Sequence, residues 1–203
     1  MKKNIERIIF VFLGSFFMGA GIALSVSTGF GSDPLAMFWQ GISNVFNISI
    51  GQSNLLMSIV LLFIPLLISQ KELGIGTIVA PLVIGQTVDS ILSLNLNYPN
   101  MIISIMVMLL GLAILALGAA IYIYADLGKS SYDATLCIIN EKTGISVGKV
   151  RSLGDLLLFV ASLTLKVNVN LAPFVAIIVV GPFIDVFLNI INNISRRRSQ
   201  VNV

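Results

Sequence analysis

The sequence predicts an all-α membrane protein of six transmembrane helices, arranged as two inverted-topology repeats of three helices, each with a short interfacial or re-entrant helix. Three observations lead to this fold class. First, 57% of the residues are hydrophobic and 10% are charged, a balance typical of a chain whose surface faces lipid. Second, six apolar runs reach the roughly 20 residues that cross a bilayer. Third, the chain repeats itself.

The repeat is centred on residues 29–52, whose plan returns 97 positions later at residues 126–149. Further along, VAPLVIGQTVDSIL and VAIIVVGPFIDVFL are identical at six of fourteen positions. A match at a fixed period over this range indicates an internal duplication. The predicted units are a first repeat at residues 1–97 and a second, inverted repeat at residues 98–203.

The six spans are expected at residues 8–27, 50–69, 75–94, 101–125, 147–166 and 171–191. The first of them follows three cations and could also be a signal peptide. It is longer than a typical signal core, and its counterpart in the second repeat lies in mid-chain. We therefore interpret it as a retained span.

Glycines recur at the same spacing in the first and fourth spans. Gly14 and Gly21 are seven residues apart, two helical turns on one face, and Gly111 and Gly118 repeat the spacing. Small residues let helix backbones approach closely in lipid. The spacing predicts tight packing between these two spans.

Two short helices are expected, at residues 34–46 and 131–142. Asp33 and Pro34 are typical of an N-cap followed by proline at the first helical position. At a rise of 1.5 Å per residue such a helix reaches only about 20 Å, too short to span. Trp39 on the first short helix is expected in the aromatic belt at the membrane surface.

The distribution of cations predicts the orientation. With the N-terminus in the cytoplasm, Lys166 is the one cation of twelve that falls outside. The cations predicted inside are Lys2, Lys3, Arg7, Lys71, Lys129, Lys142, Lys149, Arg151, Arg196, Arg197 and Arg198. This orientation predicts that both termini are cytoplasmic.

Three carboxylates lie inside predicted spans, at Asp89, Asp155 and Asp185. Each costs a few kcal/mol to place in a membrane, about 3 on insertion scales, so a partner or a role is expected. Asp89 and Asp185 are equivalent positions of the repeat. Either they bind solute or ion, or they lie near span ends and reach interfacial water. For a cation-coupled transporter, Asp185 is the preferred coupling residue.

Glycine and proline precede these two aspartates at corresponding places. Interrupted helices in two inverted halves indicate a midplane binding site. The predicted break positions are Gly85, Gly181, Pro182 and Pro81, and Gln86 is a further binding candidate.

Arg151 lies four residues before Asp155, so the two can pair on one helix face. The pair is interpreted as a structural clasp, or alternatively as a gate or an anion-binding arginine. Asn54 occupies the position of Arg151 in the first repeat and is a binding candidate as well. Tyr132 and Asp133 are expected on a solvated cytoplasmic face, and Cys137 on an apolar packing face.

The sequence lacks the residue types on which several kinds of catalytic and metal sites depend. The chain has no histidine and one cysteine, which excludes an internal disulfide, serine and cysteine hydrolase triads, and histidine-bound zinc. No metal, cofactor or nucleic acid is expected to bind, and no catalytic residue is predicted. An enzyme is therefore not expected.

The order of several motifs resembles the YitT/YczE-like family of bacterial multipass membrane proteins. These motifs are GFGSDP, NISIGQSN, GIGT at residues 74–77, IGQTVD, SSYDA and VGPFID. The resemblance implies an inner-membrane location and a suspected role in transport of a small solute. Leu35 and Ala36 depart from the aromatic and acidic residues that relatives often carry there.

The predicted function is a secondary transporter of a small polar or amphipathic solute that works by alternating access. The alternative is a membrane-embedded substrate-binding or accessory subunit of a larger transport complex. The expected partners are the lipid bilayer, a small-molecule solute, and either a second copy of the chain or other subunits of such a complex.

Overall fold

The computed structural model describes residues 2–145, 147–165, 167 and 170–201, and every regular element in them is an α-helix. Lys166 and the side chains of Lys2, Lys3 and Arg196–Arg198 lie outside the described residues, so the orientation predicted from them stays a prediction. The helices are α1 (Lys2–Ser27), α2 (Pro34–Phe46), α3 (Ile50–Ile68), α4 (Ile75–Leu92), α5 (Met101–Ala125), α6 (Ser131–Thr143), α7 (Val147–Thr164) and α8 (Ala172–Val201).

Within the described residues, five helices are long and apolar enough to cross a membrane: α1, α3, α4, α5 and α8. The predicted sixth span forms as α7, with 18 residues. Its first half carries Lys149, Arg151 and Asp155, so its composition alone does not mark it as a span. The protein is thus an all-helical membrane protein with five clear candidate spans.

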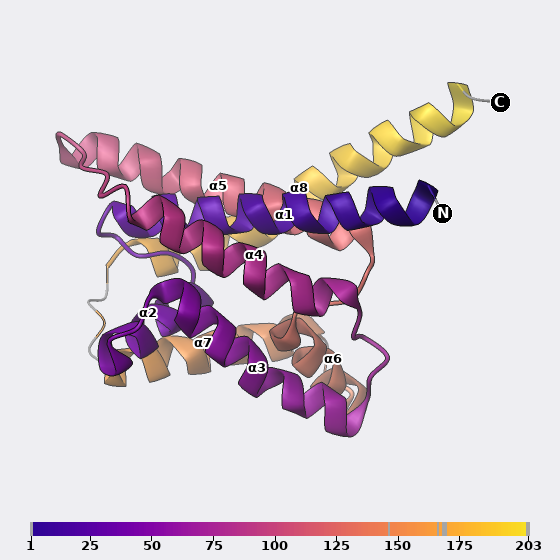
Figure 1. Ribbon diagram of the computed structural model, residues 1–203, viewed down its shortest axis with the longest axis horizontal. Helices are drawn as coiled ribbons and strands as arrows, with labels where there is room; N and C mark the ends of the chain where they lie inside the picture. The colour runs from indigo at the N-terminus through magenta and orange to yellow at the C-terminus, as the bar shows by residue number, and fades with distance from the viewer. Residues whose placement is uncertain (1, 146, 166, 168–169, 202–203) are drawn as a thin grey trace.

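The helices form two layers (Figure 1). One layer holds α1, α4, α5 and α8, and the other holds α2, α3, α6 and α7. The packing partners are mirrored between the halves of the chain. In the first layer α1 packs on α4, and α5 packs on α8 in the same way. In the second layer α2 packs on α7, and α6 packs on α3. In Figure 1, α5 and α8 run opposite to α1 and α4.

The glycine spacing places the two central helices in close contact, as predicted. A Cβ built on Gly14 would lie 2.8 Å from the carbonyl oxygen of Gly118, and one on Gly111 would lie 2.7 Å from that of Gly21. Any side chain at these positions would force the backbones of α1 and α5 apart. The antiparallel crossing of α1 and α5 is therefore set by these four glycines.

The short helices α2 and α6 both begin after a glycine with a positive φ, Gly31 at 84° and Gly128 at 106°. This left-handed conformation suits glycine because it has no Cβ. The buried residues of α2 include Trp39, which is 5% exposed in the core between the layers. This burial does not fit the expected position of Trp39 in an aromatic belt, because the packing of α2 against α7 encloses the ring within the protein.

The helix breaks predicted at Gly85, Pro81, Gly181 and Pro182 are also wrong, since α4 and α8 run through them as continuous helices. Gly85 serves close packing instead, because a Cβ there would lie 2.8 Å from the carbonyl oxygen of Gly51 on α3. Asn54 on α3 donates to the carbonyl oxygen of Pro81 at 2.8 Å. This hydrogen bond ties α3 to α4 beside the proline.

Candidate functional site

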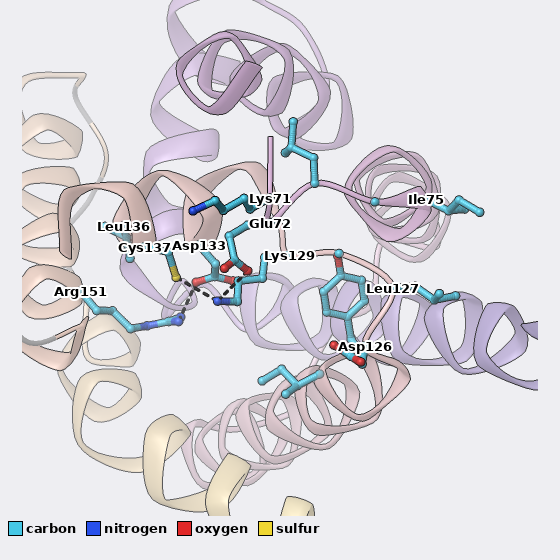
Figure 2. Close-up of a pocket in the computed structure, with 15 residues that line it drawn as sticks. Lys71, Glu72, Ile75, Asp126, Leu127, Lys129, Asp133, Leu136, Cys137 and Arg151 are labelled. Atoms are coloured by element: carbon cyan, nitrogen blue, oxygen red, sulfur yellow. Dashed lines mark hydrogen bonds and ion pairs between the residues drawn. The ribbon is translucent and has the colours of Figure 1, made fainter. Parts of the chain in front are cut away.

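A cavity of about 680 Å³ lies at the end of the molecule where α1 begins and α5 ends (Figure 2). Its walls come from the α3–α4 loop, the end of α5, the α5–α6 turn, and the first halves of α6 and α7. We call it the charged cavity, because Lys71, Glu72, Lys129, Asp133 and Arg151 line it together. Its size falls within the range of small-molecule sites.

Lys129 joins two walls of the charged cavity. Its Nζ lies 2.9 Å from Glu72 Oε2 and donates to Cys137 Sγ at 3.0 Å, and both contacts are drawn in Figure 2. Burial opposes the charge of Lys129, but the hydrogen bonds to Cys137 and Glu72 outweigh it and raise its pKa. Cys137 was expected in apolar packing; it lies instead on the cavity wall, because the α5–α6 turn brings Lys129 over it.

The segment GIGT at residues 74–77 holds this turn in place. Gly74 N–H donates to Thr77 Oγ1 at 3.1 Å, and Thr77 Oγ1 donates to the carbonyl oxygen of Lys129 at 2.6 Å. Gly76 N–H donates to the carbonyl oxygen of Leu127 at 2.8 Å. The start of α4 thus fixes the backbone from which Lys129 projects.

Arg151 is the centre of a second charged group. Its guanidinium lies 3.8 Å from Asp155 Oδ2, the pair expected from the i, i+4 spacing, and closer to Asp133 Oδ1, at 2.9 Å. Tyr132 donates its hydroxyl proton to Asp155 Oδ1 at 2.8 Å. The expectation that Tyr132 and Asp133 are solvated is wrong for Tyr132, which is 9% exposed, since α6 packs its first turn against α7.

Asp33 approaches the same charged group from the other half of the chain. It occupies the N-cap position of α2, but its side chain makes no capping hydrogen bond, and Ser32 donates to it at 3.3 Å. Burial, and then the negative charge of Asp155, raise the pKa of Asp33 above its ordinary value of 3.8. Arg151, Asp155 and Tyr132 contact one another, and Asp33 lies near enough to be influenced by the charges of Asp155 and Arg151; we call these four residues the inner cluster.

The remaining predicted site residues lie apart from both features. Asp89 accepts hydrogen bonds from Ser49 Oγ at 2.5 Å and from Gly51 N–H at 2.8 Å, so it caps the start of α3. Gln86 is exposed on α4. Asp185 is exposed on α8, and Ser146, the residue equivalent to Ser49, lies outside the described residues.

A family model described as a family of unknown function, DUF6198, matches residues 5–189. The chain belongs to the DUF6198 family. Its relatives agree with the resemblance noted from the motifs, because one of them is the membrane protein YczE. The family is thus a YczE-like family of bacterial membrane proteins.

This DUF6198 chain is 30% identical over 177 residues to an uncharacterized protein of Haemophilus influenzae, covering 86% of this chain and 79% of the relative. It is 27% identical over 157 residues to the uncharacterized membrane protein YczE of Bacillus subtilis, covering 75% and 72%. It is 22% identical over 182 residues to the uncharacterized protein YyaS of the same organism, covering 88% and 90%. No solved structure matches the chain.

The two halves of this DUF6198 protein differ at equivalent positions. Lys129 and Arg151 line the charged cavity, whereas their counterparts 97 residues earlier, Ser32 and Asn54, are 0% and 2% exposed. The counterpart of Asp133 is Ala36, also 0% exposed. The charged cavity therefore lies beside the short helix of the second half, whereas the equivalent positions of the first half are buried.

The sequence signal for the charged cavity was present but was recognised only in part. The second repeat carries Lys129 and Arg151 where the first has Ser32 and Asn54. Lys129 was explained by cytoplasmic orientation alone, whereas Arg151 was also considered as a gate or an anion-binding residue. Tyr122 and Glu72, which also line the cavity, carry no pattern of their own. They join the site only because the α3–α4 loop packs against the α5–α6 turn.

Proposed function

We propose that the protein is a secondary transporter of a small solute in the bacterial inner membrane, with six spans, two inverted repeats, and both termini in the cytoplasm. The inward-directed starts of α2 and α6 make these short helices re-entrant. In this proposal the charged cavity is the cytoplasmic entrance to the solute site. Inverted repeats support such a function because each half can adopt the packing of the other, which closes one entrance and opens the other.

The observation that carries the proposal is the asymmetry between equivalent positions. Ser32, Ala36 and Asn54 are buried, while their counterparts Lys129, Asp133 and Arg151 line a cavity. A transporter caught open to one side is expected to show this difference. A symmetric structural protein has no reason to open one half alone.

The sixth span in this proposal is α7. Its exposed apolar residues Leu153, Leu156, Leu157 and Val160 are 50–70% exposed and suit contact with lipid. Its charged Arg151 and Asp155 contact residues of α6. Intramembrane charges usually face other helices in this way rather than lipid. We further propose that the site performs no covalent chemistry, since the chain has no histidine to serve as a base.

Cysteine accessibility tests alternating access. In a Cys137→Ser background, Lys71→Cys is expected to react with an impermeant thiol reagent from the cytoplasmic side only. Ser32→Cys, an isosteric change at a buried position, is expected to react from the outside only, and only in molecules that have changed state. A position 32 thiol that reacts from the cytoplasm, or that stays unreactive under every imposed ion gradient, would contradict the proposal.

For coupling, we propose that a proton binds in the inner cluster rather than at Asp185. Asp33 and Asp155 come from different halves, and burial together with the negative charge of Asp155 raises the pKa of Asp33, so ionising both carboxylates carries a cost. Among the described residues, no three carboxylate or thiol groups lie close enough to hold a metal ion. A shared proton therefore suits this cluster better than a metal cation does.

Uptake by proteoliposomes under an imposed proton gradient tests this assignment. Asp33→Asn is expected to abolish gradient-driven accumulation of the solute while leaving exchange across the membrane, because a permanently neutral side chain removes the proton step. Asp185→Asn serves as the matched variant and is expected to accumulate solute at the parental rate. The reverse pattern would restore the sequence-based assignment to Asp185.

A further inference from the structure

The charged cavity has no carboxylate left to bind a cationic ligand. Glu72 lies 2.9 Å from Lys129, Asp133 lies 2.9 Å from Arg151, and the third carboxylate on the wall, Asp126, lies 2.7 Å from Arg7. Each carboxylate on the wall is therefore already in an ion pair. A cationic solute would have to displace one of these pairs in order to bind.

The polar groups on the cavity wall that have no partner are hydrogen-bond donors. Tyr122 lines the cavity and is 7% exposed, and its hydroxyl has no hydrogen-bond partner among the described residues. Buried hydroxyls are nearly always paired, so an unpaired one points to an absent partner. Lys71 is exposed at the rim and forms no ion pair within the described part of the chain.

The cations that already have partners retain donors as well. An ammonium group has three N–H donors, and Lys129 uses two of them, on Glu72 and Cys137. The guanidinium of Arg151 has five N–H donors, of which the described contacts to Asp133 and Asp155 use part. The cavity thus presents unused donors, and Lys71 is the cation on its wall that has no ion pair among the described residues.

The rest of the wall is apolar. Leu73, Ile75, Ile123 and Leu127 line the cavity beside the polar groups, and Figure 2 shows Ile75 and Leu127 on the side away from Arg151. A ligand that fills both parts needs an apolar body and a head that accepts several hydrogen bonds. Carboxylates meet the second condition best, since they accept charge-assisted bonds from ammonium, guanidinium and hydroxyl donors.

We propose that the charged cavity binds an organic anion, a carboxylate with an apolar body, through Tyr122, Lys71 and Lys129. The inference deepens the proposed function and rests on it only in naming this anion as the carried solute. Binding itself needs no transport and can be measured on the protein in detergent.

Three probes with one body and different heads test the class of ligand. Phenylacetate, 2-phenylethylammonium and 2-phenylethanol differ in charge but share the phenyl ring, and inorganic phosphate supplies an anion without an apolar body. Phenylacetate is expected to raise the melting temperature of the purified protein and to bind at least about tenfold more tightly than the other three, the range of one charge-assisted hydrogen bond. Tighter binding of the ammonium or the alcohol would overturn the proposal.

Tyr122→Phe removes the unpaired hydroxyl alone. It is expected to weaken phenylacetate about tenfold or more, and at the same time to raise the melting temperature without probe, because an unsatisfied buried group disappears. Tyr124→Phe on the same helix is the control, since its hydroxyl bonds to Ser195 and it does not line the cavity; phenylacetate affinity should not change. Equal affinity in Tyr122→Phe and the parent would refute the role of Tyr122.

Lys71→Gln covers the case in which Tyr122→Phe does not fold. Lys71 is exposed and in no described ion pair, so its replacement leaves the fold intact and is expected to weaken phenylacetate by about threefold, with no effect on 2-phenylethanol. Unchanged phenylacetate affinity would contradict the proposal. Selective binding of phenylacetate without uptake would uphold the anion site and reject transport. Uptake of a cationic solute would uphold transport and reject the anion site.

Discussion

Gly111→Ala is expected to destabilise the protein, although alanine is the better helix former. Its Cβ would lie 2.7 Å from the carbonyl oxygen of Gly21 and 2.9 Å from the backbone nitrogen of Ser25. Both atoms belong to the backbone of α1, so only a separation of α1 from α5 can relieve the clash. Overpacking typically costs about 1–3 kcal/mol, and Gly111→Val should exceed that range and prevent recovery of folded protein.

The matched control is Gly181→Ala on α8, where a Cβ has no described atom within 4 Å. There the gain in helix propensity of about 0.5–1 kcal/mol is expected to appear as unchanged or higher stability. Melting in detergent would compare the two variants with the parent. Equal melting temperatures for Gly111→Ala and Gly181→Ala would mean that the α1–α5 crossing is not set by its glycines.

Arg151→Ala is expected to produce the second large loss. It leaves Asp133 and Asp155 without their cation, and stranding a buried charge costs about 3–5 kcal/mol. Because the Arg151 side chain is 51% exposed, solvent reduces the expected loss to about 1–3 kcal/mol. A lower melting temperature at neutral pH would show this loss.

Double variants distinguish which partner matters more. Asp133→Asn should restore more stability to Arg151→Ala than Asp155→Asn does, since Arg151 lies 2.9 Å from Asp133 and 3.8 Å from Asp155. Lys149→Ala on the same helix is the control, because Lys149 is exposed and in no ion pair among the described residues; its melting temperature should match the parent. Simple additivity in both double variants would show that the pairs contribute nothing.

Patterns that depend on neighbours along the chain were predicted well. The short helix at Pro34–Phe46 has the predicted bounds. The glycines of α1 and α5 were matched to each other by their spacing alone. All of these features follow from helix geometry within about two turns, which the sequence encodes directly.

Patterns that depend on which helices meet were predicted poorly. Trp39 was assigned to the membrane surface by its residue type, and Asp89 was assigned to solute or interfacial water by its depth. The structure buries Trp39 in the core and uses Asp89 to cap α3. A tryptophan or a carboxylate can satisfy the same physical needs in several places, so its role depends on the neighbour that the fold supplies.

The sequence by itself determined that this is a helical membrane protein, that its two halves share one plan, and which helix faces pack most closely. Hydrophobicity, period and glycine spacing are properties of the chain, so they survive in any arrangement of the helices. The charged cavity and the inner cluster were decided by the tertiary structure alone. Asp33 is influenced by the charge of Asp155 only because the fold brings the starts of α2 and α6 into the protein. Glu72 contacts Lys129 only because the α3–α4 loop packs against the α5–α6 turn.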